Sequence, residues 1–163
     1  MRAALDTNIL AYAEGVNAPE QKDQALEVIR RLAVGTAVLP VQVLGELFSV
    51  LVRKAGRPSA VARAAVLAWR DAFPLIDTSA AVLMGAADLA TDHSLNIWDA
   101  IILAAAAEGG CRLLLSEDLQ DGMVLGQVTV RSPFTLKAGE PIAHYAVVTG
   151  AASRHRPRGR PSR

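Results

Sequence analysis

Short apolar runs alternate with helix-like segments along most of the chain, and this alternation limits the folds that it can adopt. Each run is long enough for one buried strand, and most are bounded by Gly, Pro or polar residues. The runs are RAAL at 2–5, the first half of AVLPVQVL at 37–44, FPLI at 73–76, CRLLL at 111–115 and VTV at 128–130. Strands that alternate with helices usually form a parallel sheet with helices on both faces. We therefore predict an α/β fold, a three-layer α/β/α sandwich with a four- or five-stranded parallel sheet.

Between these runs, apolar residues recur at helical spacing. Thr7 and Asn8 indicate a helix start, because both side chains can cap exposed backbone N–H groups. The helix that contains Glu46 is expected to end near Gly56. The other predicted helices cover residues 19–32, 59–72, 79–91 and 98–108.

The regular pattern fades after residue 133. We predict a folded domain over residues 1–134, an extension over 135–150 that adds an edge strand or packs as a tail, and a disordered basic tail over 151–163. Residues 154–163 hold five of the 17 basic residues and no acid, so residues 1–153 have 12 basic against 16 acidic residues and a net charge of −4. The tail arginines can add salt-sensitive affinity for RNA phosphates, but a solvated tail is the simpler interpretation.

Composition sets further limits. A chain of 163 residues fits one domain, and 52% apolar residues with 4% aromatics indicate an aliphatic core and argue against intrinsic disorder. No apolar run approaches the ~20 residues that span a bilayer. The N-terminus lacks the apolar stretch of a signal peptide. We therefore expect a cytoplasmic protein without a membrane partner.

Four acids stand where a parallel sheet would bring them together. Asp6 ends the first predicted strand, Asp118 follows CRLLL, Asp99 opens a helix, and Glu46 lies early in another. Ligands of open parallel sheets bind beyond the carboxyl ends of the strands. A like-charge pair at ~5 Å costs about 3 kcal/mol at an effective dielectric near 20. A hard divalent cation removes this cost, and all-oxygen ligation favours magnesium or manganese over zinc.

Each acid also has a structural interpretation when it is considered alone. Asp6 can cap the following helix, Glu46 can be a solvated charge, Asp99 suits the positive end of a helix, and Asp118 can belong to a turn. Trp98 is interpreted as a core residue rather than a base-stacking platform. The three histidines are scattered, and neither a phosphate-binding glycine loop nor a GxSxG motif is present. Carboxylates are therefore the main candidates for chemistry.

Taken together, the motifs resemble the PIN-domain family, and in particular its VapC-type ribonuclease toxins. The resemblance extends over residues 1–134 or so, and each of its four acidic motifs keeps its acid. The matching segments are LDTNILAY at 5–12, QVLGELFSVL around Glu46, NIWDAIILAAA at 96–106, LLLSEDLQDG at 113–122 and VTVRSPF at 128–134.

This resemblance implies an endoribonuclease that depends on Mg²⁺ or Mn²⁺ and has a five-stranded parallel sheet. It implies that Asp6, Asp99 and Asp118 bind the metal, while Glu46 positions the metal or the attacking water. Thr7 or Asn8 would orient Asp6, and Ser116 would orient Asp118, although helix capping explains these residues equally well. The resemblance also implies an RNA substrate, a VapB-type antitoxin and a homodimer.

Other functions remain open. A PIN-domain nuclease of RNA processing or decay would have the same chemistry without an antitoxin. A non-catalytic receiver-like module also gathers acids at strand ends, but it needs a lysine just after its last strands. VTVRSPF at 128–134 offers Arg131 instead, and the first lysine after it is Lys137. A haloacid-dehalogenase phosphatase needs a second Asp two residues after the first, where this chain has Asn8. Asp121 is a possible fifth acid, but its Asp-Gly context equally suits a turn.

Overall fold

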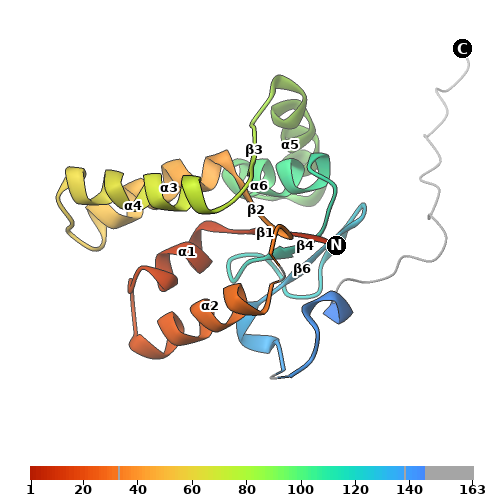
Figure 1. The fold of residues 1–163 in the computed structure, drawn as a ribbon. Helices are drawn as coiled ribbons and strands as arrows, with labels where there is room; N and C mark the ends of the chain where they lie inside the picture. The colour runs from red at the N-terminus through yellow and green to blue at the C-terminus, as the bar shows by residue number, and fades with distance from the viewer. Residues whose placement is uncertain (33, 138, 146–163) are drawn as a thin grey trace, which may run out of the picture.

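A mostly parallel sheet forms the centre of the molecule in the computed structural model, which describes residues 1–32, 34–137 and 139–145 (Figure 1). The strand order is β3-β2-β1-β4-β6-β5. The strands are β1 Arg2–Leu5, β2 Ala37–Pro40, β3 Leu75–Ile76, β4 Cys111–Leu115, β5 Val124–Leu125 and β6 Val128–Arg131. All neighbouring pairs are parallel except β5 with β6. The predicted α/β fold and its five parallel strands are therefore confirmed.

The antiparallel strand β5 was not predicted. It pairs with β6 through Leu125 and Val128, and Gly126, at a φ of +59°, allows the chain to reverse between them. Because apolar residues continue from Met123 to Val130 with few breaks, the sequence pattern does not separate two strands there.

Helices cover both sides of the sheet. Figure 1 shows α5 and α6 on one side of the sheet and α1 and α2 on the other, while α3 and α4 extend sideways as an antiparallel pair. The helices are α1 Thr7–Ala13, α2 Pro19–Arg31, α3 Val41–Arg53, α4 Ser59–Ala72, α5 Ala80–His93 and α6 Ile97–Glu108. No helix in the described part of the chain is long and apolar enough to cross a membrane.

Aliphatic side chains on the central strands form the core. Leu5, Leu39 and Leu113 are fully buried, and so is most of α6 from Ala100 to Ala106. Burial of one such leucine contributes roughly 1.5–3 kcal/mol. The small alanines of α6 allow this helix to pack on the sheet and on α5 at once. The rigid sheet beneath therefore fixes where the ends of β1 and β4 lie.

The first part of the predicted extension packs against the domain. The chain turns through the short 3₁₀ helices η1 Pro133–Thr135 and η2 Ile142–Tyr145. Arg31 on α2 donates to the carbonyl oxygens of Lys137, at 3.0 Å, and Glu140. Ile142 enters the core. Within the described residues, the edge strand considered for this extension is thus replaced by a packed 3₁₀ turn; the predicted basic tail over 151–163 lies outside the described residues.

Candidate active site

Asp6 is a buried carboxylate at the junction of β1 and α1. It caps α1 with an extended backbone, and its Oδ1 accepts a 2.7 Å hydrogen bond from the backbone N–H of Thr7. Its side chain is only 2% exposed. The capping interpretation is therefore correct, but a cap at a protein surface does not need such burial.

Ser116 connects Asp6 to the loop that carries Asp118. Strands β1 and β4 pair in register at Leu5 and Leu115, so the residues after both strands meet. The Ser116 hydroxyl donates to Asp6 Oδ2 at 2.6 Å and accepts from the backbone N–H of Asp118 at 3.2 Å. The expected link between Ser116 and Asp118 is thus present through the backbone, while the hydroxyl proton serves Asp6.

Glu46 reaches the same region from α3, which follows β2 directly. Its Oε2 accepts a 2.6 Å hydrogen bond from the Thr7 hydroxyl, and its Oε1 accepts one from Gln42 Nε2 at 3.2 Å. Thr7 therefore contacts two acids, Asp6 with its backbone and Glu46 with its side chain. Gln42 was not predicted as a site residue, although its position one helical turn before Glu46 is a detectable signal.

Asp99 lies in the first turn of α6 and is half-buried. Asn96 caps this helix by accepting a 2.9 Å hydrogen bond from the backbone N–H of Trp98. The cap fixes the start of α6 and with it the place of Asp99. Trp98 itself is exposed, so its interpretation as a core residue was wrong.

Electrostatics indicate that the four acids lie near one another. Burial raises the pKa of Asp6 from 3.8 to about 7, hydrogen bonds from Ser116 and Thr7 lower it in part, and the charges of Asp118 and Asp99 raise it. The pKa of Asp99 is also raised, first by burial and then by the charges of Asp118 and Glu46. No ion pair between described residues involves any of the four. Among the described residues, none of the four acids is therefore neutralised by an ion pair.

The donor set suits a hard divalent cation, because it consists of carboxylate oxygens that repel one another. Within the described residues, however, no three His, Cys, Asp or Glu side chains already lie close enough together to hold an ion. The side chains must therefore move closer to coordinate one jointly. Asp118 is exposed, whereas Asp6 is fixed by two hydrogen bonds, so the mobile partner in such a movement would be Asp118.

A cavity of about 350 Å³ adjoins the acids between α1 and α3. Glu46 and Asp118 line it together with Tyr12, Asn17 and Lys54. Tyr12 donates a hydrogen bond to Glu117. Neither Tyr12 nor Glu117 was predicted as a site residue, and an aromatic residue inside an amphipathic helix gives no signal that distinguishes it from core.

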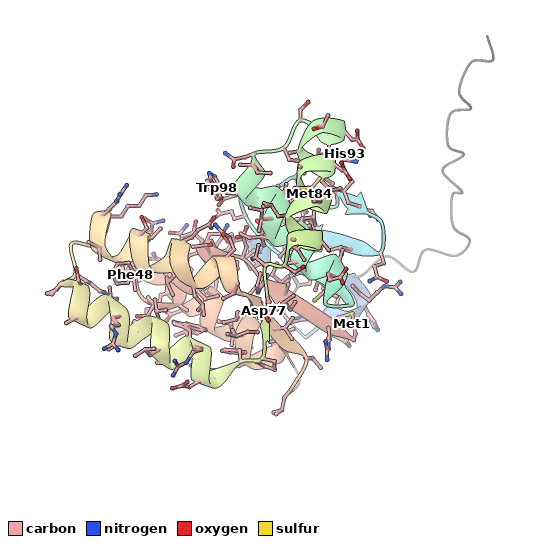
Figure 2. All side chains as sticks on the ribbon, turned by 90° about the horizontal axis from the view of Figure 1, so that it is seen from above. Met1, Phe48, Asp77, Met84, His93 and Trp98 are labelled. Carbon is pink, nitrogen blue, oxygen red and sulfur yellow. The ribbon has the colours of Figure 1, made fainter. Side chains whose placement is uncertain are left out.

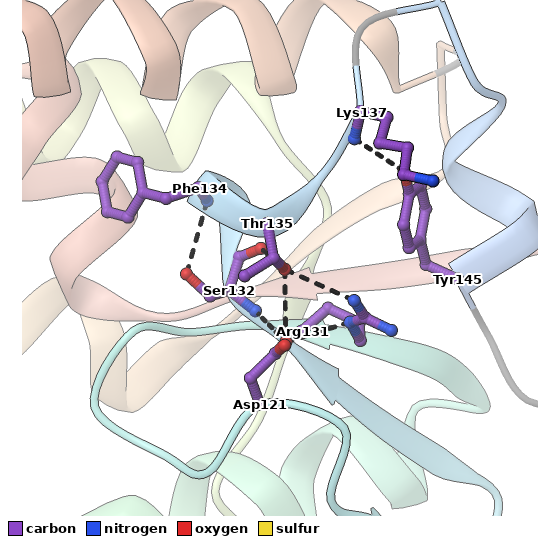
Figure 3. A network of polar contacts seen from close by, with 7 residues as sticks. All are labelled: Asp121, Arg131, Ser132, Phe134, Thr135, Lys137 and Tyr145. Carbon is purple, nitrogen blue, oxygen red and sulfur yellow. Dashed lines mark hydrogen bonds and ion pairs between the residues drawn. The ribbon is translucent and has the colours of Figure 1, made fainter.

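The possible fifth acid, Asp121, is engaged elsewhere. Asp121 forms an ion pair with Arg131 at 2.9 Å and accepts from the backbone N–H of Ser132 at 2.8 Å, so it holds the loop after β4 against β6 (Figure 3). Tyr145 lies over the Arg131 guanidinium, 5.1 Å from ring centroid to Cζ. Arg57, just after α3, pairs with Glu14 at 2.7 Å.

Known proteins share this fold. A toxin–antitoxin complex from Klebsiella pneumoniae has 21% identity and a TM-score of 0.61, with 80% of this chain and 97% of that chain covered. VapC20 of Mycobacterium tuberculosis, a toxin that cleaves the sarcin–ricin loop, has 20% identity and a TM-score of 0.60, with 71% and 91% covered. VapBC2 from Rickettsia felis, bound to a promoter DNA fragment, has 18% identity and a TM-score of 0.60, with 81% and 98% covered.

The chain has no significant match among curated protein sequences. The family model of the PIN domain, in contrast, matches residues 3–120. This stretch begins in β1, includes all four acids and ends in the loop after β4. Because the match spans most of the chain, the protein belongs to the PIN domain family.

Proposed function

We propose that this protein is a metal-dependent endoribonuclease that hydrolyses phosphodiester bonds in RNA and acts as the toxin of a VapBC-type pair. The observation that carries the proposal is the burial of Asp6 near the charges of Asp118 and Asp99, without an ion-pair partner among the described residues. Burial of an ionisable group without a partner of opposite charge destabilises a fold. Such an arrangement is typical of a functional site rather than of a structural one.

Asp6, Asp99 and Asp118 would hold the metal, and Glu46 would position it or the attacking water. A bound Mg²⁺ or Mn²⁺ supplies Lewis acidity toward the phosphodiester and lowers the pKa of a water molecule. Asp6 provides a fixed carboxylate, because Thr7 and Ser116 hold both of its oxygens. Thr7 and Gln42 fix the orientation of Glu46 in the same way. Asp6 and Glu46 thus contribute preorganised negative charge, and the metal-activated water would be the nucleophile.

The proposed partners are an RNA substrate, a VapB-type antitoxin and a second copy of this chain. Support comes from the relatives with this fold, one of which is a toxin–antitoxin complex and another a VapBC pair. One of these relatives, VapC20, cleaves RNA at the sarcin–ricin loop. A nuclease of RNA processing or decay remains the alternative, and it would act on RNA without an inhibitor.

Induced expression in bacteria tests this proposal. The wild-type chain is compared with Asp99→Asn, and new RNA 5′ ends are mapped by sequencing. We expect growth arrest and discrete new ends with the wild type, and neither with Asp99→Asn. Asp88→Asn is the matched control, because Asp88 is an exposed acid on α5 that lies outside the cluster.

The purified chain gives the second measurement. Cleavage of the RNA identified in cells should require added Mg²⁺ or Mn²⁺ and stop with a chelator. Arrest that persists in Asp99→Asn, or cleavage that continues in the chelator, would contradict the carboxylate mechanism. Cleavage without growth arrest would favour the processing nuclease over the toxin.

A further inference from the structure

Trp98 is an exposed tryptophan at the entrance to the proposed site. Its side chain is 56% exposed, although the residues that follow it in α6, Ala100 to Ala106, are buried. Figure 2 shows Trp98 at the surface, apart from Phe48 on α3. Exposure of so large an apolar ring is unfavourable for the isolated protein, so a ligand that covers it would gain free energy.

A shallow groove of about 310 Å³ lies beside this ring. Its other walls are polar side chains and backbone of α3, namely Gln42, Gly45, Glu46 and Ser49. A Cβ atom added at Gly45 would meet nothing within 4 Å. The glycine therefore leaves open space opposite Trp98, and this space can admit a flat ring.

The groove leads to the carboxylates. Glu46 and Ser49 line both this groove and the 350 Å³ cavity that contains Asp118. Trp98 also directly precedes Asp99 at the capped start of α6. A ligand seated on Trp98 would therefore extend into the proposed cleavage site.

Charge determines which part of an RNA strand fits here. The four acids repel phosphates, and residues 1–153 carry a net charge of −4. Among the described residues that line the groove beside Trp98, none is basic, so attraction there must come largely from uncharged contacts. Stacking of a base on an aromatic ring is such a contact, and it tolerates any base because every base has a π-face.

We propose that Trp98 is the stacking platform for an unpaired nucleobase of the RNA strand, next to the phosphodiester that is cleaved. This inference rests on the proposed nuclease function and adds a substrate subsite to it. The polar walls of the groove favour a base over a protein surface, because base edges can form hydrogen bonds with Gln42 and Ser49. A base paired in a duplex is already stacked and is expected to gain little from the ring.

The test measures RNA binding separately from cleavage. Fluorescence anisotropy in a chelator records the affinity of the full chain for a labelled single-stranded 12-nucleotide RNA of mixed sequence. Trp98→Ala should weaken binding roughly 5- to 100-fold, while Trp98→Phe keeps most of the affinity. Phe48→Ala is the matched control, since Phe48 is an exposed aromatic residue (37%) outside the groove, and it should leave the affinity unchanged.

Gly45→Leu gives a second, independent variant. It fills the groove while residue 98 stays tryptophan, and it improves the helix propensity of α3. It should weaken single-strand binding as Trp98→Ala does, and neither variant should alter binding of the matching RNA duplex. Unchanged single-strand affinity in both variants would overturn the proposal. If, in addition, these variants had an altered oligomeric mass in ultracentrifugation, Trp98 would be assigned to a protein interface instead.

The same preparation distinguishes this inference from the proposed function. The wild type is incubated with the RNA identified in cells and with Mg²⁺ or Mn²⁺, and cleavage of that RNA is followed on gels. Trp98-dependent binding without any metal-dependent cleavage would refute the nuclease function and keep the stacking platform. Cleavage that is equally efficient in Trp98→Ala would refute the platform and keep the nuclease.

Discussion

The Ser116 hydroxyl donates a 2.6 Å hydrogen bond to Asp6 Oδ2, so the residue after β4 holds the carboxylate at the end of β1. The Ser116 hydroxyl oxygen also accepts a hydrogen bond from the backbone N–H of Asp118. One hydroxyl thereby connects two of the proposed metal ligands. It also lowers the pKa of Asp6, against the larger effect of burial.

Ser116→Ala should reduce cleavage about 10- to 100-fold, the usual cost of losing a group that orients metal ligands. Without the hydroxyl, the pKa of Asp6 rises further, and the Asp118 loop loses an acceptor. The pH profile of the cleavage rate measures this. The midpoint of its rising limb should move to higher pH in the variant, and activity should partly recover in alkaline buffer. A lower rate with an unmoved pH profile would mean that Ser116 acts only on structure.

Asp6 should make the metal-free protein less stable as pH rises. Its pKa is about 7 in the folded protein and 3.8 ordinarily, so the folded state binds the proton more tightly than the unfolded state. This contribution is fully present below pH 4 and is lost as pH rises to about 7, by on the order of 4 kcal/mol. Thermal melts in a chelator between pH 4 and 8 measure the loss.

Asp6→Asn supplies the comparison, because an amide does not titrate. Its melting temperature should lack this decline and exceed that of the wild type at pH 8, while cleavage is abolished. Asp88→Asn should keep the wild-type decline, since Asp88 is an exposed acid of α5. Parallel melting curves for the wild type and Asp6→Asn would contradict the buried-carboxylate interpretation.

The parallel sheet was predictable because each of its strands is a short apolar run with clear boundaries. Leu113 to Leu115, for example, are buried on both faces, and a continuous apolar run is the pattern for such a strand. The short edge strand β5 was missed because its residues merge with those of β6. A local pattern also cannot show which partner completes an edge pair.

The positions of the four acids at helix and strand ends were also predictable, whereas their polar partners were not. Thr7 and Glu46 are 39 residues apart, and their hydrogen bond depends on how α1 packs against α3. The exposure of Trp98 depends in the same way on where α6 begins relative to its neighbours. Such contacts are decided by tertiary packing, which residue types and periodicity do not encode.

Thr7→Val should lower cleavage about 10-fold or more with little change in packing volume. The substitution removes the 2.6 Å hydrogen bond to Glu46 Oε2, so this carboxylate keeps only Gln42 as an orienting partner among the described residues. Single-turnover kinetics at several metal concentrations measure the effect. Thr7→Ser keeps a hydroxyl and should restore most of the activity. Full activity in Thr7→Val together with a loss in Thr7→Ser would show that the methyl group, and not the hydrogen bond, matters.

Divalent cations should stabilise the wild type in a pH-dependent manner. At a concentration 100 times the dissociation constant, Mg²⁺ or Mn²⁺ adds about 2.7 kcal/mol to the free energy of unfolding. At pH 8 the cation meets an ionised Asp6, whereas at pH 5.5 it must displace a proton from it, because the pKa of Asp6 is about 7. The rise in melting temperature on adding Mn²⁺ should therefore be larger at pH 8. Asp99→Asn should lose most of this rise and Asp88→Asn none of it, and an equal rise in both would place the cation away from these acids.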